Sequence, residues 1–178
     1  MTYYKFLKEN GSSPQGYGEW HLPKSKRPGK WMPKIEGELA ACENGYHVLR
    51  DTDLIHWLGP VLWEVEIKGE LVESGDKCIT RQARLIRKVD TWNERSQRLF
   101  ACWCAERVLH LYEKQYPDDS RVRQCIETAR LYANGKATLE DLRAASWASR
   151  AASRAASEAA SRASRAAQSA HLLEILEL

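Results

Sequence analysis

The sequence predicts an α+β protein, with a small mixed sheet domain followed by a helical region that ends in a long alanine-rich helix. The first observation is the alternation of large apolar and acidic residues from Trp63 to Ile67, which is typical of a half-buried strand. The second is the C-terminal composition. There, 13 of the 27 residues from 144 to 170 are alanine, the best helix former, and neither glycine nor proline interrupts them.

The first 38 residues predict little regular structure. The run Tyr3 to Leu7 favours one short strand, and three prolines exclude a continuous helix after it: Pro23, Pro28 and Pro33. Trp20 and Trp31 lie among these turn-forming residues. An aromatic side chain in such a loop either packs on the neighbouring core, which we favour here, or stacks on the ring of a ligand.

Residues 39 to 90 predict a compact α/β piece. We expect a strand around Tyr46 and Val48, and then a short helix from Asp53 to Leu58 with Asp51 or Thr52 as its N-cap. The strand that contains Trp63 should end at Gly69. After a turn at Ser74 to Asp76, residues 79 to 89 alternate again and predict another strand.

Residues 91 to 143 predict helices. The first begins at Ser96 and should turn Leu99, Trp103, Leu111 and either Arg107 or Val108 toward a core. A break at residues 116 to 120 precedes a second helix, capped by Asp119 or Ser120 and ended by Asn134-Gly135. The capping-box pattern from Thr138 to Asp141 begins a third helix that should run close to the C-terminus.

These patterns divide the chain into residues 1–90, a small α/β domain, residues 91–143, a helical hairpin region, and residues 144–178, an alanine-rich helix. Such a helix buries little area per residue and is a poor folder alone. Its end is apolar, with Leu172, Leu173, Ile175, Leu176 and Leu178. That end packs either on the same chain or between identical chains. We favour a homo-oligomer.

Composition excludes several classes of protein. The net charge of +3 is too small to indicate nucleic-acid binding, and charged residues interrupt the apolar C-terminal stretch, which disfavours a membrane role. The N-terminus lacks the apolar run of a signal peptide, and the five cysteines are odd in number. We therefore expect reduced thiols and a cytoplasmic protein.

No established catalytic or metal-binding motif is present. Cys102 and Cys104 lie two residues apart in a predicted helix, so their side chains point apart, and no second ligand pair occurs. The sequence also lacks a P-loop, a GxGxxG fingerprint and an HExxH motif. We expect no catalytic residue, no metal and no cofactor.

Two stretches resemble known families. The element Cys42 to His47, the apolar strand ending at Gly69-Glu70, and the turn at Asp76-Lys77 with its basic strand resemble a small phage-encoded domain of unknown function, over about residues 1 to 90. Residues 99 to 107, the Tyr-Pro-Asp-Asp segment at 116 to 119 and the alanine-rich tail are similar to bacterial and phage proteins named as immunity proteins. This second resemblance implies a role in immunity or interaction.

A further similarity connects Gly45 to Val48, Asp53, Trp57 and the strand ending at Gly69 with the middle of the ADP-ribosyltransferase fold. In that fold the region lines the pocket for the nicotinamide–ribose end of NAD. The upstream His-Gly-Ser/Thr or Arg element of the family is absent here, and Glu70 and Glu73 match its catalytic glutamate by position only. The resemblance therefore implies ligand binding more than catalysis.

Basic and aromatic residues supply the candidate ligand-binding site. Lys77, Arg81 and Arg84 form either a phosphate site or a solvated strand face, the latter favoured. His47 either bonds a ligand or lies buried against Asp51 or Asp53. The site would combine Lys77, Arg81 and Arg84 for phosphate, His47 and Glu43 for a ribose, and Trp20, Trp31 or Tyr46 for a base.

The leading hypothesis is a phage-type binding protein of the bacterial cytosol. It would sequester a nucleotide-derived immune signal, NAD-derived or cyclic, and so counter antiviral defence. One alternative is an ADP-ribosyltransferase-like or nucleotide-cleaving enzyme that uses His47 with Glu70 or Glu73. The other is an immunity or interaction protein that acts on a partner through its long helix.

Overall fold

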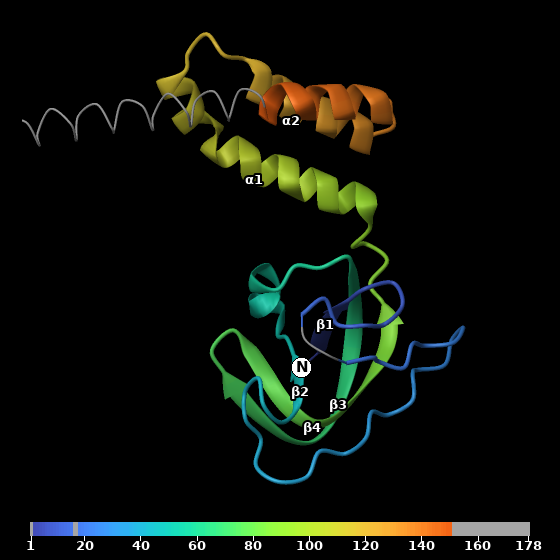
Figure 1. Cartoon of the computed structure of the whole chain (residues 1–178). Helices are drawn as coiled ribbons and strands as arrows, with labels where there is room; N and C mark the ends of the chain where they lie inside the picture. The colour runs from blue at the N-terminus through green and yellow to red at the C-terminus, as the bar shows by residue number, and fades with distance from the viewer. Residues whose placement is uncertain (1, 16–17, 151–178) are drawn as a thin grey trace, which may run out of the picture. The chain divides into compact units, whose positions relative to one another are not determined.

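A computed structural model describes residues 2–15 and 18–150 of the chain. It divides the chain into two compact units, Met1–Asn93 and Glu94–Leu178, and each unit is described here by itself. The domain boundary predicted from the sequence was residue 90. The expectations about the helix beyond residue 150 and its apolar end fall outside the described residues. Figure 1 shows the elements of both units.

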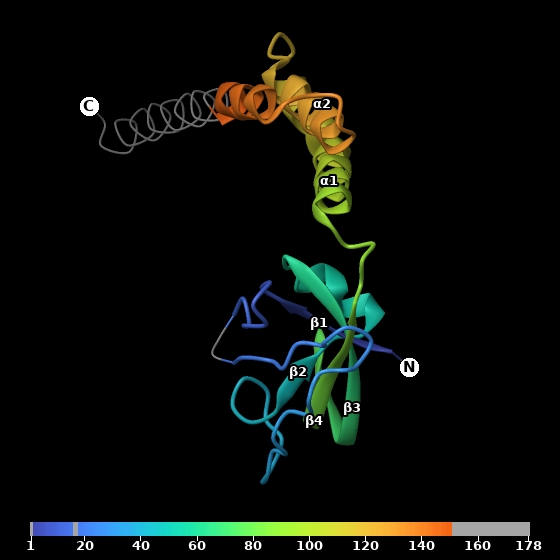
Figure 2. The same ribbon diagram turned by 90° about the vertical axis from the view of Figure 1, so that its right-hand side faces the viewer.

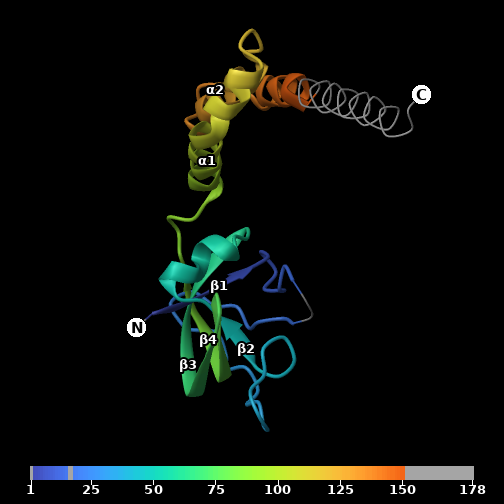
Figure 3. The same ribbon diagram turned by 90° about the vertical axis from the view of Figure 1, so that its left-hand side faces the viewer.

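The N-terminal unit is a four-stranded antiparallel sheet that curls until its two edges meet. Its strands are β1 (Tyr3–Leu7), β2 (Tyr46–Val48), β3 (Val61–Ser74) and β4 (Lys77–Lys88), in the order β1-β3-β4-β2. Tyr4 of β1 and Leu49, just beyond β2, exchange both backbone hydrogen bonds, each 2.8 Å long. Figures 2 and 3 show this curl from its two sides. The α+β class is confirmed, and the sheet is antiparallel rather than mixed.

The inner face of the curled sheet holds the main core. The expected alternation is confirmed, since Trp63 and Val65 are buried there and Ile67 packs against them. The buried members of this cluster come from all four strands and from the long loop between β1 and β2: Leu7, Trp20, Met32, Val48, Val61, Trp63, Val65, Cys78, Ala83 and Leu85. Trp20 therefore packs in the core, as the favoured interpretation has it.

The loop between β1 and β2 protects the part of β4 that β2 is too short to cover. An uncovered strand edge is a site for unwanted pairing, so its backbone groups need partners. The amides of Gly29, Met32 and Ile35 donate in turn to the carbonyls of Leu85, Ala83 and Arg81, at 2.8 to 2.9 Å.

Two predicted boundaries in this unit are wrong. Gly69 does not end its strand, because it adopts a positive φ of 89° at a shift in register between Lys68 and Leu71. The bulge lets β3 continue to Ser74. The short helix is a 3-10 helix, Asp51–His56, with Arg50 as its N-cap residue. Asp53 accepts the hydrogen bond from the Arg50 amide, so neither Asp51 nor Thr52 is the cap.

The helical unit contains α1 (Glu94–Gln115), α2 (Arg121–Ala133) and the start of a third helix, described over residues 139–150. The capping box is confirmed, since the Asp141 amide donates to the Thr138 hydroxyl and the Thr138 amide donates to the Asp141 carboxylate. The end of α2 is also as expected. Gly135 takes a φ of 70°, and the next amide returns to the carbonyl of Leu131.

The predicted inward face of α1 is wrong. Its buried residues are Cys102 and Leu109, which pack with Ile126 of α2. Trp103 and Leu111 are instead 52% and 60% exposed. Apolar side chains occur all around this helix, so its periodicity does not select a face. The small side chains on the chosen face, Cys102 and Ala105, allow α2 to approach closely. Among the described residues, no helix is long and apolar enough to cross a membrane.

Candidate functional site

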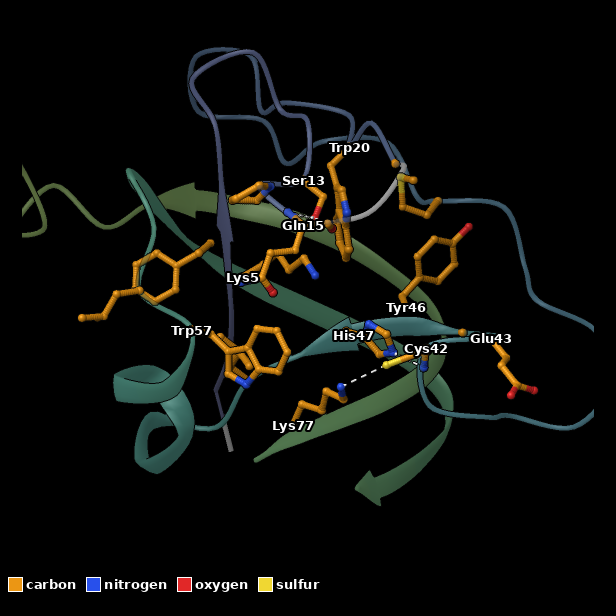
Figure 4. A pocket seen from close by; sticks show the side chains of 17 residues that line it. Lys5, Ser13, Gln15, Trp20, Cys42, Glu43, Tyr46, His47, Trp57 and Lys77 are labelled. Atoms are coloured by element: carbon orange, nitrogen blue, oxygen red, sulfur yellow. Dashed lines mark hydrogen bonds between the residues drawn. The ribbon is translucent and has the colours of Figure 1, made fainter. Parts of the chain in front are cut away.

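A pocket of about 430 Å³ lies within the N-terminal unit, where the curled sheet meets the loop between β1 and β2. Its volume falls in the range of small-molecule sites. Lys5 comes from β1, His47 from β2 and Lys77 from the start of β4. Trp20 and Trp57, from the loop and from the end of the 3-10 helix, supply the aromatic lining. Figure 4 shows these side chains around the pocket.

The alternation of side chains along β1 explains why Lys5 points into the pocket. Successive side chains of a strand point to opposite faces, so Tyr3, Lys5 and Leu7 share one face. Both Tyr3 and Leu7 contact the main core, and Lys5 pairs in register with the buried Trp63. Lys5 is therefore held half-buried, with its ammonium group directed into the pocket rather than into bulk solvent.

Each lysine of the pocket lies over a tryptophan ring. The Lys5 Nζ is 5.6 Å from the centroid of Trp20, and the Lys77 Nζ is 4.8 Å from the centroid of Trp57. In the described part of the chain, neither ammonium forms an ion pair with a carboxylate. Among the described residues that line the pocket, the one acid is Glu43, and Figure 4 shows its carboxylate pointing away from the two ammonium groups.

The two ammonium groups shape the electrostatics of the pocket. Burial, and then repulsion by Lys77, lower the pKa of Lys5 to about 8. Burial, followed by repulsion from Lys5 and Lys77, lowers the pKa of His47 to about 4. At neutral pH the pocket therefore holds two cationic lysines and a neutral imidazole.

His47 has a structural partner, although not the carboxylate that the sequence suggested. Its Nε2 accepts a hydrogen bond of 3.0 Å from the Cys42 amide, which leaves the proton of the neutral ring on Nδ1. The carboxylate of Asp53 is held by Arg50 at 2.7 Å, and Asp51 accepts from the Thr52 amide. The buried pairing with Asp51 or Asp53 is therefore wrong.

Cys42 completes this corner of the pocket. The Lys77 ammonium donates to its Sγ at 3.3 Å, and the residue adopts a positive φ of 65°. Gly45 follows it in the turn before β2. Its backbone passes so close to Ile79 that an added Cβ would lie 2.2 Å from the Ile79 Cγ2. This close passage sets where β2 begins and so where His47 enters the pocket.

Five of the predicted site residues line this pocket: Trp20, Glu43, Tyr46, His47 and Lys77. The Tyr46 ring packs edge-on against Trp20, with ring centroids 5.7 Å apart. Its hydroxyl donates to the carbonyl of Pro33, and burial raises its pKa. The side chain of Tyr46 is therefore held in place and forms part of the pocket wall.

The other three predicted residues, Arg81, Arg84 and Trp31, are not part of the pocket lining. Arg81 forms an ion pair with Glu70 and Arg84 with Glu66, each at 2.6 Å. The Arg84 guanidinium also lies 4.6 Å from the centroid of Trp31. The basic run on β4 has no acid within itself, but the register with β3 places acids opposite its arginines. These cations hold the hairpin together.

The enzyme hypothesis needs His47 close to Glu70 or Glu73, and the structure does not bring them together at this pocket. Neither glutamate is part of the lining. Glu70 is bound to Arg81, and Glu73 is bound to Arg50 at 2.8 Å. Over the residues that the structure describes, no group of three or more His, Cys, Asp or Glu side chains could hold a metal ion.

Among the lining residues that were not predicted as site residues, three have side chains suited to ligand binding: Lys5, Cys42 and Trp57. The signal for Lys5 was available, because a lysine between Tyr3 and Leu7 interrupts the apolar face of a predicted strand. Cys42 and Trp57 were named only as parts of the two family resemblances, and no local pattern placed them at the site. Cys42 and Trp57 meet Lys77 only because the turn before β2 and the end of the 3-10 helix lie beside the start of β4.

Comparison with known proteins identifies a relative of the helical part only. The family described as "Imm-5 like putative immunity protein" matches residues 88–172, slightly less than half of the chain. No curated protein and no solved structure matches the chain. Residues 1–87, which carry the pocket, lie outside the family match, so their resemblance to a phage domain and to the ADP-ribosyltransferase fold stays a prediction. The C-terminal region, from residue 88 onward, is similar to an immunity protein.

Proposed function

We propose that this chain is an immunity-type binding protein, and that its helical unit holds a protein partner rather than transforming a substrate. The observation that carries the proposal is an apolar surface on α1, within the segment that matches the immunity-protein family. Trp103, Val108 and Leu111 are 52%, 57% and 60% exposed there. Exposed tryptophan and arginine residues are the usual anchors of protein interfaces.

Trp103 and Leu111 lie in one row along the helix, with Arg107 between them and Val108 beside the row. Residues that are four and eight positions apart lie one above the other on a helix surface, so Trp103, Arg107 and Leu111 form a continuous strip. The Arg107 guanidinium lies 5.0 Å from the centroid of Trp103 and covers part of its ring. Charged side chains over large apolar ones give such a surface both solubility and a site for a partner.

The test compares capture of one identified partner by matched variants. The partner, once captured from the host and identified by mass spectrometry, should be retained by the unaltered chain and lost at least tenfold with the double variant Trp103→Glu and Leu111→Glu. Glu127→Lys, on the exposed side of α2, is the control and should retain it. Equal retention by the double variant would refute this surface.

A second candidate function is sequestration of a nucleotide-derived signal in the N-terminal pocket. The supporting observation is the combination of two unpaired lysines with two tryptophan rings in one cavity, the lysines having no carboxylate partner in the described residues. Lys77 would contact phosphate, His47 and Glu43 a ribose, and Trp20 a base. A protein of this kind would act in the bacterial cytosol, as a homo-oligomer, and leave its ligand intact.

Calorimetry with NAD, ADP-ribose and cyclic dinucleotides tests this second function directly. Tight binding of one of them, with the same molecule recovered unchanged after denaturation, would support sequestration. Recovery of a cleaved product would favour the enzyme instead. Light scattering on the same sample measures the copy number, and a monomer would rule out the homo-oligomer.

A further inference from the structure

We propose that Lys5 and Lys77 form a phosphate subsite in the N-terminal pocket, and that protonation of Lys5 makes binding at this subsite depend on pH. The inference rests on the second candidate function above and names its anion contact and its regulation. Its ligand class is a phosphate ester of a planar heteroaromatic ring. The arginines of β4, which the basic run suggested for the phosphate, have no part in it.

The curl of the sheet creates the subsite. Lys5 lies on β1 and Lys77 on β4, two strands that β3 separates within the sheet. Because the edges of the sheet meet at Tyr4 and Leu49, both lysines face the same cavity. Lys77 is close enough to Lys5 to lower the pKa of the Lys5 ammonium, and both lysines lower the pKa of His47. An anion between two ammonium groups removes this repulsion, which is a direct source of binding energy.

Four other cations of the unit are already neutralised. Four arginines, Arg50, Arg81, Arg84 and Arg87, each form an ion pair with a carboxylate at 2.6 to 2.8 Å. A phosphate arriving at any of them would have to displace that carboxylate. In the described residues the lysines of the pocket contact only tryptophan rings and the Cys42 thiol, so no anion has to leave.

The aromatic lining indicates what the phosphate is attached to. Trp20 and Trp57 both line the cavity, each beside one of the two lysines. A planar ring that stacks on a tryptophan face gains binding energy whatever its hydrogen-bonding pattern, and bases commonly do so. A phosphate on Lys5 and Lys77 thus leaves a ring of the same molecule within reach of either indole.

Lys5 is the group that senses pH. The other ionisable groups that line the cavity are Cys42, Glu43, Tyr46, His47 and Lys77. His47 is neutral at all pH values well above 4, and burial raises the pKa of Tyr46. With a pKa of about 8, Lys5 loses its charge in the empty pocket just above neutrality. Bound phosphate opposes that loss, so above pH 8 the ligand binds together with a proton, and its affinity falls as pH rises.

The experiment is titration calorimetry of the full chain with ADP-ribose and with inorganic pyrophosphate, at pH 7.0 and at pH 9.5. We expect the affinity to fall about tenfold or more at the higher pH, because each pH unit above the pKa of Lys5 lowers the affinity by up to tenfold. Lys5→Arg should bind at both values with little change, because arginine keeps its charge. Lys77→Met should weaken binding at both values. Lys8→Met removes an exposed lysine just beyond β1 and should change nothing.

Each contrary result has a distinct meaning. If neither probe binds at pH 7.0 to protein that circular dichroism shows to be folded, this inference fails. The second candidate function fails as well if NAD and the cyclic dinucleotides also do not bind. If a probe binds but Arg81→Ala weakens it while Lys77→Met does not, the function stands and the subsite is wrong. Equal affinity at both pH values refutes the role of Lys5. A pH dependence that is absent from the Cys42→Ser variant would also refute the role of Lys5, because it would arise from Cys42 instead.

Discussion

Over the described residues, the curled sheet of the N-terminal unit buries ten residues in one core cluster, whereas the helical unit buries three in its own. The sheet unit pairs four of its arginines with carboxylates, whereas two lysines beside its cavity have no carboxylate partner among the described residues. The helical unit instead leaves large apolar side chains, such as Trp103 and Leu111, at its surface. The contrast supports both proposals, a small-ligand site in the sheet unit and a protein-binding surface on the helical unit.

Truncating a buried side chain should therefore lower the free energy of unfolding more in the sheet unit than in the helical unit. Leu85 is fully buried on β4, and Leu85→Ala should lower the free energy of unfolding by about 2–5 kcal/mol. Leu109→Ala, in the smaller helical cluster, should cost about 2 kcal/mol, because a site with few neighbours collapses more easily. Chemical denaturation followed by hydrogen exchange in each unit measures both, and equal costs would remove the contrast.

Replacing Lys5 should raise the stability of the sheet unit. Its pKa is about 8 in the folded unit and near 10.5 when exposed, so the folded state pays to keep it charged. Lys5→Met should therefore add about 1–3 kcal/mol at pH 7. The cost is present in full below pH 8 and disappears as pH rises toward 10.5, so the gain should shrink over that window. Chemical denaturation at pH 7 and at pH 10.5 measures the gain in stability, and Lys8→Met is the control. A loss of stability at pH 7 would contradict the repulsive pocket.

The local part of this architecture was predictable from sequence, and the pocket was not. Alternation was enough to place the strand through Trp63, and the Thr138 to Asp141 pattern was enough to begin the third helix. These signals involve neighbours along the chain. The pocket depends on strand register and on the closure of the sheet, which bring Lys5 to Lys77. The same register pairs Arg81 with Glu70, so the basic run looked like a site although its charges were neutralised across the hairpin.

Removing the capping box at Thr138 should lower the free energy of unfolding by less than the substitutions above, and only in the helical unit. The Thr138 hydroxyl accepts from the Asp141 amide at 3.1 Å, and hydrogen bonds from Thr138 lower the pKa of the Asp141 carboxyl. Thr138→Ala should cost about 1 kcal/mol, the usual value for an N-cap residue. Thr138→Ser keeps a hydroxyl and should cost less. Hydrogen exchange at the start of the third helix would show the change, and equal protection in all three proteins would mean that the cap is not needed.

The smallest effect on stability is expected at the surface of α1, and this separates a binding role from a structural one. A residue that holds a fold together is costly to replace, whereas a residue reserved for a partner can be changed without harm to the free chain. Leu111 is 60% exposed, so Leu111→Gln should change the free energy of unfolding by less than about 0.5 kcal/mol. Denaturation of the variant measures this change. If Leu111→Gln destabilised the unit as much as Leu109→Ala, the strip would be packed within the chain, and the proposal of a protein-binding surface would lose its basis.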